Sequence, residues 1–271
     1  MIRFIVTLLL FNVLTPLQSQ STHHKKGDWL FYWGWNRSAY AKSDVHLKGD
    51  DYAITLKNVV AHDRQSKELK TFINPSTITI PQFNCRIGYF FKNNWAITAG
   101  WDHMKYVMDT YQVVEASGTI GTTISSPTIT TSNYAGTYNN TPIAIQPSFL
   151  TFEHTDGLNY ACVEIAKYHE FYTRKKLTLS YHYGGGVGLF VPRTDVRLFG
   201  VGKNNYWNVA GMGISAKGGI ECLIGNHFFI QTNAQLGAAY LPSIRTTGRK
   251  GDSASQNIQY VERYAVFGVK F

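Results

Sequence analysis

The sequence predicts an all-β protein, an eight-stranded antiparallel transmembrane β-barrel with long extracellular loops and short periplasmic turns. Three observations support this fold class. Apolar and polar residues alternate in eight segments, the connections between those segments are alternately short and long, and the chain begins with the pattern of an export signal. A period of two is expected where one face of a strand meets lipid and the other a narrow polar lumen. We expect one barrel domain over residues 22–271.

Residues 1–21 have the pattern of a secretory signal peptide. Arg3 supplies a positive charge, residues 4–14 are almost all apolar, and Ser19-Gln-Ser21 has the small residues of a cleavage site. The apolar run is shorter than the roughly 20 residues that a helical span needs. We therefore expect an exported chain that is cleaved after Ser21 or Ser19.

Eight segments alternate between two faces and are bounded by turn residues. They are residues 29–42, 79–91, 95–108, 158–173, 177–192, 209–224, 227–241 and 258–271. The fourth segment is irregular, because its charged residues at 164, 167, 169 and 170 do not share one face. We expect a β-bulge or an early end of the strand there.

The connections between the segments alternate in length. Residues 92–94, 174–176 and 225–226 are tight turns, whereas residues 43–78, 109–157, 193–208 and 242–257 are long and polar. Within the second long connection, residues 117–132 are rich in Thr and Ser and carry no charge, which fits either a mobile surface loop or a β-ribbon. Short turns on one side and long loops on the other are typical of outer-membrane barrels. An even number of strands then places both termini in the periplasm.

The last segment ends on an aromatic residue. Val261, Ala265, Phe267, Val269 and Phe271 fall on one face of an extended chain. With this strand, its terminal Phe and the export signal, the sequence resembles the class of bacterial outer-membrane barrels that includes the OmpA transmembrane domain, OmpX and OmpW. The resemblance implies location in the cell outer membrane, contact with its lipids and lipopolysaccharide, recognition of the last strand by the barrel-assembly machinery, and a monomer.

Composition excludes several other classes of protein. Aromatic residues make up 14% of the chain and charged residues only 16%, against about 25% in soluble domains. The net charge of +9 comes from scattered Lys and Arg without interleaved aromatics, so we expect no nucleic-acid partner. Cys85, Cys162 and Cys222 lie far apart within predicted strands, which favours small apolar side chains over disulfides. No CxxC spacing exists, which excludes structural zinc and iron–sulfur sites.

The alternation assigns side chains to the two faces of the barrel wall. On the outer face we predict a membrane aromatic girdle that includes Trp29, Trp33, Trp35 and Phe271. The lumen is predicted to receive six charged residues: Arg86, Asp102, Lys217, Glu221, Glu262 and Lys270. An eight-stranded barrel is filled by its own side chains, and three basic and three acidic groups can pair. We expect a structural plug; a proton or ion path is the alternative.

Four sequence positions place a carboxylate within two residues of a histidine, all in the first two long connections or at their junctions with strands. They are Asp44 with His46, His62 with Asp63, Asp102 with His103, and His154 with Glu153 and Asp156. A neighbouring carboxylate can fix the tautomer of a catalytic or metal-binding His. The candidate catalytic residues are therefore His46, His62, Asp63, His103, His154 and Asp156. Adjacent residues of a strand point to opposite faces, however, and polar loops collect such pairs, so surface solvation is favoured and no cofactor is expected.

The predicted function is that of a structural or surface-interaction barrel, with the role carried by its extracellular loops, and we expect no catalytic activity. One alternative is a lipid- or metal-dependent hydrolase with a divalent metal at the outer rim. It requires at least two of His46, His62, His103 and His154 to reach one cavity. The other alternative is a conduit for small hydrophobic molecules. It requires an apolar lumen on the loop side and a gap between strands.

Overall fold

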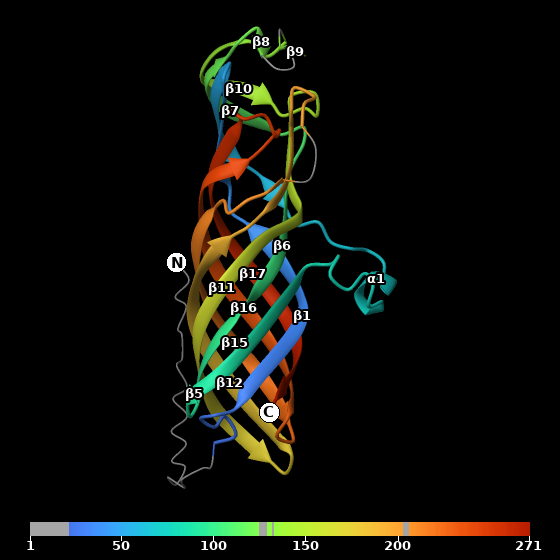
Figure 1. The fold of residues 1–271 in the computed structure, drawn as a ribbon, viewed down its shortest axis with the longest axis vertical. Helices are drawn as coiled ribbons and strands as arrows, with labels where there is room; N and C mark the ends of the chain where they lie inside the picture. Colours follow the sequence, from blue (N-terminus) through green and yellow to red (C-terminus); the bar gives the residue numbers. More distant parts are fainter. Residues whose placement is uncertain (1–21, 125–128, 132, 203–205) are drawn as a thin grey trace, which may run out of the picture.

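The computed structural model describes residues 22–124, 129–131, 133–202 and 206–271. In this part of the chain one antiparallel sheet of fifteen strands dominates the molecule (Figure 1). Eight long strands form its lower part: β1 (Trp29–Tyr40), β5 (Phe83–Lys92), β6 (Trp95–Met108), β11 (Leu150–Arg174), β12 (Leu177–Phe190), β15 (Gly211–Ile224), β16 (Phe228–Arg245) and β17 (Ser253–Lys270). All eight pair in the order in which they follow one another along the chain, and β17 also pairs with β1. The eight strands therefore form a closed antiparallel ring.

The pairing register fixes the tilt of the strands in this ring. One circuit of paired residues runs through Leu30, Gly88, Thr98, Glu164, Gly186, Ser215, Gly237, Tyr260 and Tyr40. It returns to β1 at Tyr40, ten residues beyond its start at Leu30. A stagger of this size over eight strands corresponds to a tilt of about 40°, within the range of closed barrels.

The eight strands follow the predicted segments closely. The main differences are at one end of the barrel, where β11 begins at Leu150, β16 continues to Arg245 and β17 begins at Ser253. The register of β11 against β12 shifts between Glu170 and Tyr172, which is the irregularity expected there, yet the strand continues to Arg174. The three tight turns each contain a residue with positive φ: Asn94, Lys175 and Gly225. We call the end that carries these turns the turn end.

The long connections are not simply irregular loops, because many of their residues form further strands or extend the strands of the ring. They contain β2 (Ser43–Gly49), β3 (Tyr52–Val59), β4 (Ala61–His62), β7 (Val113–Ile120), β8 (Thr123–Ile124), β9 (Ile129–Thr130), β10 (Gly136–Ala144), β13 (Arg193–Leu198) and β14 (Tyr206–Trp207). The order β17-β2-β3-β7-β10 continues the barrel wall beyond the ring, and β13 pairs with the first residues of β11. The described Thr/Ser-rich residues thus belong to β-ribbons; residues 125–128 and 132 lie outside the described part.

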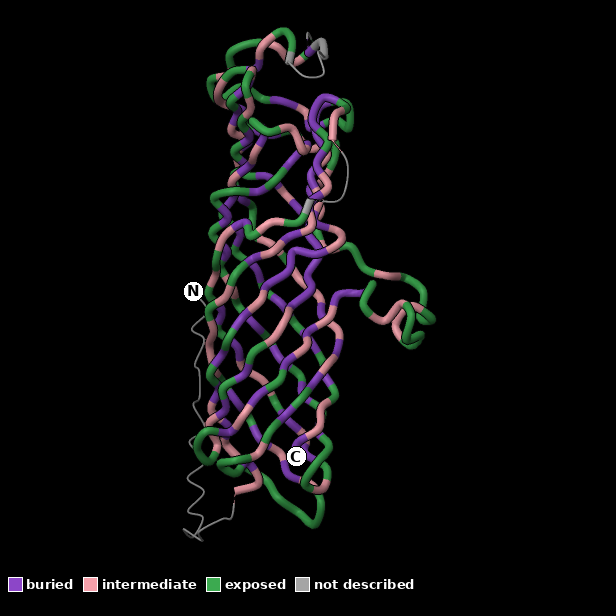
Figure 2. Tube along the Cα trace, viewed as in Figure 1, coloured by how far each residue is buried: buried purple, intermediate pink, exposed green. Residues whose placement is uncertain are grey.

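These strands and the adjoining ends of β6, β11, β16 and β17 form what we call the crown. Alternate residues of β2 and β3, including Val45, Leu47, Ile54 and Leu56, point to its interior and are at most 2% exposed. They belong to one apolar cluster that also contains Phe152 and extends down to residues of the ring. Buried positions accordingly recur along the strands of both ring and crown, in alternation with more exposed ones (Figure 2). The crown has a hydrophobic core of its own.

A single excursion leaves the barrel sideways (Figure 1). It comprises residues 63–82, which we call the side arm, and contains the short helix α1 (Lys70–Ile73). No helix in the described residues has the length and apolar character needed to span a membrane. The base of the arm is fixed to the wall, because Asp63 accepts a hydrogen bond from the backbone nitrogen of Ser38 and another from Gln82.

Candidate functional site

The lumen of the ring holds a cluster of buried charges. Arg86 on β5 donates two hydrogen bonds to the carboxylate of Asp102 on β6, at 2.7 and 2.9 Å. Its Nε lies 2.9 Å from Oε2 of Glu164 on β11, and Nζ of Lys217 on β15 lies 2.6 Å from the same oxygen. These four side chains are at most 4% exposed. Because β5, β11 and β15 are not neighbours in the sheet, the contacts cross the lumen and block it at this level.

Amides extend the cluster to a third carboxylate. Glu262 on β17 accepts hydrogen bonds from the side chains of Asn84 at 3.1 Å and Gln235 at 3.0 Å. The same two amides also donate to Asp102. Each of these carboxylates therefore has hydrogen-bond donors, which buried charges require. The result is one polar network that joins β5, β6, β11, β15, β16 and β17.

All six charged residues predicted for the lumen are buried: Arg86, Asp102, Lys217, Glu221, Glu262 and Lys270. Arg86 pairs with Asp102, whereas the other four have partners that the prediction did not include. The central partner is Glu164, whose orientation was obscured by the mixed charges of its strand. In the structure Glu164 shares the buried face of its strand with Cys162 and Tyr168.

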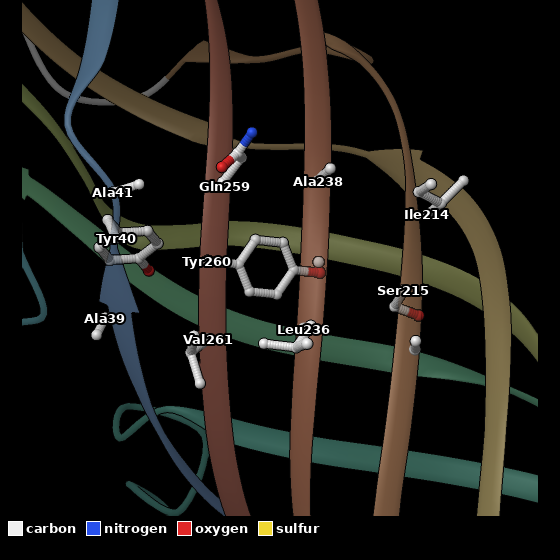
Figure 3. Close-up of a pocket in the computed structure, with 12 residues that line it drawn as sticks. Ala39, Tyr40, Ala41, Ile214, Ser215, Leu236, Ala238, Gln259, Tyr260 and Val261 are labelled. Carbon is white, nitrogen blue, oxygen red and sulfur yellow. The ribbon is translucent and has the colours of Figure 1, made fainter. Parts of the chain in front are cut away.

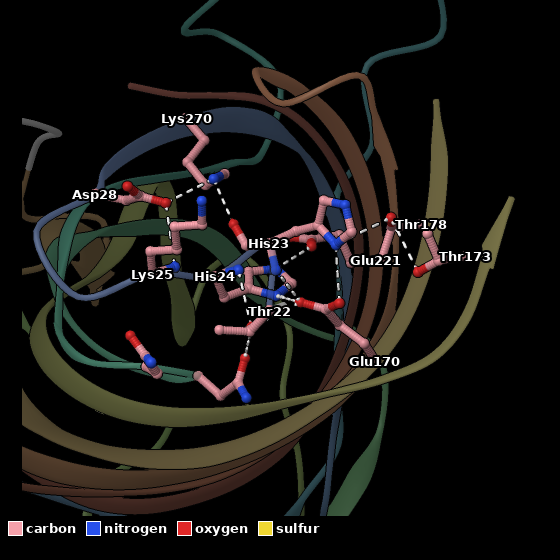
Figure 4. Close-up of polar contacts among 12 residues, drawn as sticks. Thr22, His23, His24, Lys25, Asp28, Glu170, Thr173, Thr178, Glu221 and Lys270 are labelled. Carbon is pink, nitrogen blue, oxygen red and sulfur yellow. Dashed lines mark hydrogen bonds and ion pairs between the residues drawn. The ribbon is translucent and has the colours of Figure 1, made fainter. Parts of the chain in front are cut away.

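The N-terminal segment before β1 occupies the turn end of the lumen (Figure 4). His24 is 1% exposed; its Nε2 lies 2.6 Å from Glu221, and its Nδ1 lies 3.1 Å from Glu170. Its ring stacks on that of Tyr168, with the centroids 4.7 Å apart. The backbone nitrogen of His23 donates to Glu170 as well, at 2.6 Å. We call residues 22–28 the plug segment.

The two neighbouring carboxylates, Glu170 and Glu221, stabilise the protonated form of His24. Burial by itself lowers the pKa of this imidazole, but the negative charge of Glu221 and the hydrogen bonds to Glu170 and Glu221 outweigh burial and raise the pKa to about 9. At neutral pH both ring nitrogens therefore carry protons and both donate. Neither His23 nor His24 was predicted as a site residue, because neither has a carboxylate within two residues in the sequence.

Lys270, predicted as a lumen charge, fixes the plug segment to the last strand. Its Nζ lies 2.6 Å from Oδ2 of Asp28 and donates to the backbone oxygen of His23 at 2.6 Å. The backbone of Trp29 forms two hydrogen bonds with that of Phe271, at 2.7 and 2.9 Å. The two described ends of the chain are thus joined at the turn end.

The histidines of the predicted rim do not share a partner. His46 is exposed and lies 2.8 Å from the hydroxyl of Thr55. His62 contacts Asp109 at 2.6 Å, whereas its sequence neighbour Asp63 binds the base of the side arm. The pairings inferred from sequence spacing are therefore not the contacts that form.

The other two rim histidines are buried in separate places. His103 lies 2.8 Å from Asn159 and stacks on Phe83. His154 lies inside the crown 3.0 Å from the hydroxyl of Thr194, and burial lowers its pKa to about 3. Asp156 forms an ion pair with Arg193 at 3.3 Å instead of contacting His154.

The described residues contain no group of three or more His, Cys, Asp or Glu side chains arranged to hold a metal ion. The three cysteines are unpaired; Cys162 is buried, and Cys85 and Cys222 are half-buried. The candidate catalytic residues are thus placed apart from one another and each has its own local partner.

The outer face of the ring is apolar. Trp29 and Phe271 are 46% and 66% exposed near the turn end. Trp33 and Trp35 lie further along β1 and pack edge to face, with ring centroids 4.8 Å apart. All four residues of the predicted girdle therefore lie on the outer face.

A shallow hollow interrupts this outer face across β1, β17, β16 and β15 (Figure 3). Apart from Gln259, its outward residues are small or aliphatic: Ala39, Ala41, Ile214, Ala216, Leu236, Ala238 and Val261. Behind them the ring of Tyr260 occupies the place where a side chain at Gly237 would lie. The hollow is therefore lined mostly by short side chains on the outside and is backed by the ring of Tyr260 on the inside.

The closed ring of tilted strands, the filled polar lumen and the apolar outer face define a small β-barrel protein of the outer-membrane type. The chain is similar in fold to the outer membrane protein OprG from Pseudomonas aeruginosa, with 10% identity, a TM-score of 0.44 and coverage of 93% of this chain and 99% of that one. It is also similar to the outer membrane protein AlkL, with 10% identity, a TM-score of 0.39 and coverage of 94% of each chain. The same holds for Neisserial surface protein A, with 10% identity, a TM-score of 0.37 and coverage of 91% of this chain and 98% of that one. No protein-family model matches the chain, and no curated protein sequence does.

Proposed function

We propose that this protein is an integral barrel of the bacterial outer membrane whose crown stands outside the cell as a rigid interaction surface, with the turn end and both termini in the periplasm. The outward apolar side chains of the ring support the embedding. Phe31, Ile165, Ile220 and Phe267 are 42–56% exposed and come from β1, β11, β15 and β17, which are distributed around the ring. Strands tilted by about 40° cross the roughly 25 Å apolar band in about ten residues, and the ring strands are at least that long.

The observation that carries the proposed role is the closure of the barrel interior at three levels. The plug segment occupies the turn end, the network of Arg86, Asp102 and Glu164 crosses the middle, and apolar side chains fill the crown. A path for ions or water would have to displace buried, mutually neutralised charges. The barrel therefore serves as a support for the crown.

The crown suits a surface role because it is rigid as well as exposed. Its strands are hydrogen-bonded to the ring through β17 and β11, and its interior is apolar and buried. Polar side chains such as His46, Thr55 and Lys57 lie on its outer surface. A prearranged polar surface binds a partner without the entropic cost of ordering a loop.

The two alternative functions receive less support. A conduit for hydrophobic molecules requires an apolar interior on the loop side, and the crown has one. It also requires a gap between strands, whereas each of the eight described ring strands is paired with a neighbour on both sides. A hydrolase requires histidines that converge, whereas His46, His62, His103 and His154 contact four different residues.

Conductance and surface labelling test the proposed function together. In planar bilayers the purified protein should show no stable open-channel current, and removal of residues 22–27 together with Glu164→Ala should increase the leak current.

In a variant whose three cysteines are replaced by Ala, a membrane-impermeant maleimide should label Thr137→Cys in the crown on intact cells. Asn226→Cys at the turn end should react only after the outer membrane is permeabilised. A stable channel in the wild type contradicts the sealed lumen, and the reverse labelling pattern contradicts the orientation.

Mass spectrometry of outer-membrane lipids tests the hydrolase. Cells with the wild type, with no protein and with a His62→Ala/His154→Ala double variant should give the same lipid profile. A lipid product that needs the wild-type histidines would favour catalysis over the surface role.

A further inference from the structure

Two arginines face each other on the outer wall of the ring. Arg37 on β1 and Arg263 on β17 are paired in register, and both lie on the outward face of their strands. Along the whole of β1 and β17 they are the only charged residues at outward positions; the others there are aromatic, aliphatic or small and polar. Two like charges directly opposite each other on a sheet repel and destabilise the pair.

The described residues neutralise this pair only in part. Arg37 is half-buried; its guanidinium donates weakly to the backbone oxygen of Asn36, at 3.4 Å, and Asp63 supplies an opposing charge. Arg263 is exposed, and no carboxylate among the described residues forms an ion pair with it. The two guanidinium groups together thus carry more positive charge than their protein neighbours balance. An anion outside the chain would complete the site.

The position of the pair on the wall indicates the source of that anion. A cation on the lipid-facing side of a barrel is strongly destabilising at the bilayer midplane and almost without cost near the headgroups. Arg37 follows directly on the outward Trp33 and Trp35, residues of the kind that gather at a membrane interface. This places the pair at headgroup level in the leaflet nearer the crown.

The side arm adds an apolar component beside the pair. Phe72 packs edge to face on Trp35, with ring centroids 5.9 Å apart, and so holds α1 close to the wall. Leu69 and Ile73 on the same arm are 74% and 68% exposed. Exposed aliphatic side chains on a short lateral projection suit the boundary between headgroups and acyl chains.

We propose that Arg37 and Arg263 bind a phosphate of a phosphorylated glycolipid, lipopolysaccharide, in the outer leaflet, while Leu69 and Ile73 of the side arm insert among its acyl chains. The inference rests on the proposed membrane embedding and orientation. Guanidinium groups bind phosphate oxygens through paired, charge-assisted hydrogen bonds, and two of them can share one dianionic group. The lipid then removes the repulsion between the arginines and fixes the side arm.

Native mass spectrometry with defined lipids tests this site. The protein in detergent is mixed with lipid A that carries both phosphates or with the same lipid after dephosphorylation. The wild type should retain one molecule of the phosphorylated lipid. Arg37→Gln/Arg263→Gln should weaken this binding by about tenfold or more, as expected for the loss of charge-assisted hydrogen bonds. A matched control, Arg174→Gln/Lys176→Gln, removes the same charge at the turn end and should bind like the wild type.

Equal binding by wild type and Arg37→Gln/Arg263→Gln would overturn the site, as would equal binding of the dephosphorylated lipid. Insertion into liposomes separates this failure from that of the proposed function. If wild type and variant both insert and stay folded, the membrane assignment stands and only the lipid site is lost. If the wild type does not insert, the proposed function fails first.

Fluorescence tests the arm independently. A solvatochromic dye on Ile73→Cys, in the cysteine-free background, should report an apolar environment in bilayers that contain phosphorylated lipid A. The same dye on Thr137→Cys in the crown should report water. A water-like signal at residue 73 would overturn insertion of the arm.

Discussion

Arg86 and Glu164 belong to strands that are separated by β6, yet Nε of the arginine lies 2.9 Å from Oε2 of the glutamate across the barrel interior. Lys217 reaches the same glutamate from β15, on its other side. Glu164 is therefore the residue through which three parts of the ring are electrostatically connected. Its removal leaves two buried cations with one partner fewer.

The first prediction concerns this residue. Glu164→Ala should lower the free energy of unfolding by about 3–5 kcal/mol, the range for breaking a buried ion pair on one side. Urea unfolding of the refolded protein, followed by tryptophan fluorescence, measures the change. Val163→Ala on the outward face of the same strand is the control and should cost about 1 kcal/mol or less, because its side chain is 48% exposed. Similar losses in both variants would show that the buried ion pairs of Glu164 do not stabilise the barrel by the predicted amount.

The second prediction is a loss of stability of the plug segment at high pH. His24 has an ordinary pKa of 6.5 and a pKa of about 9 in the folded protein, so its ion pairs contribute fully below pH 6.5 and are lost as the pH rises through about 9. The contribution is on the order of 3 kcal/mol. Proteolysis of residues 22–28 should therefore accelerate between pH 7 and 10. In His24→Leu the same pH dependence should be absent, and its persistence would contradict the assignment to His24.

The third prediction places an opposite pH dependence in the crown. Burial keeps His154 neutral in the folded protein down to about pH 3, whereas in the unfolded chain it takes up a proton near pH 6.5. Stability of the crown should therefore decrease as the pH falls from 6.5 towards 3, by up to about 5 kcal/mol. Hydrogen exchange of β11 and β13 amides at pH 4.5 and 7 measures it. His154→Phe should reduce the difference, while His46→Gln on the surface should leave it unchanged.

The fourth prediction concerns the packing of Gly237 and Tyr260 in the wall at the hollow. A side chain at Gly237 would collide with the ring of Tyr260, whereas one at Gly218 would meet only the backbone oxygen of His182 at 3.7 Å. Gly237→Ala should therefore destabilise the barrel by about 1–3 kcal/mol, as overpacking does. Gly218→Ala should be neutral or slightly stabilising, since it restricts the unfolded chain. Thermal unfolding compares the two, and equal melting temperatures would exclude the collision.

Much of the ring could be predicted from the sequence because burial in a strand has a period of two. The alternation in residues 258–271 assigned Glu262 to one face and Phe267 to the other, as the structure has them. Glu164 was harder to assign, because a register shift near Glu170 follows it and mixes charged residues on both faces.

The strands of the crown show the same period of two in their sequence, but they were not predicted. Val45 and Leu47 alternate with polar residues, as do Tyr52, Ile54 and Leu56, which is the pattern of half-buried strands. The surrounding polar residues and the length of the connections favoured loops instead. The pairing of β2 with β17 depends on a strand more than 200 residues later in the chain, which composition does not reveal.

By itself the sequence determined that strands alternate, where the tight turns fall and which face of each strand is polar, because these depend on residues that are neighbours along the chain. Only the tertiary structure decided which polar residues meet. The stagger of ten residues around the ring brings Arg86, Glu164 and Lys217 to one level, and closure of the ring brings Arg37 opposite Arg263. Such contacts depend on register and on the width of the lumen, and both are set by the ring as a whole.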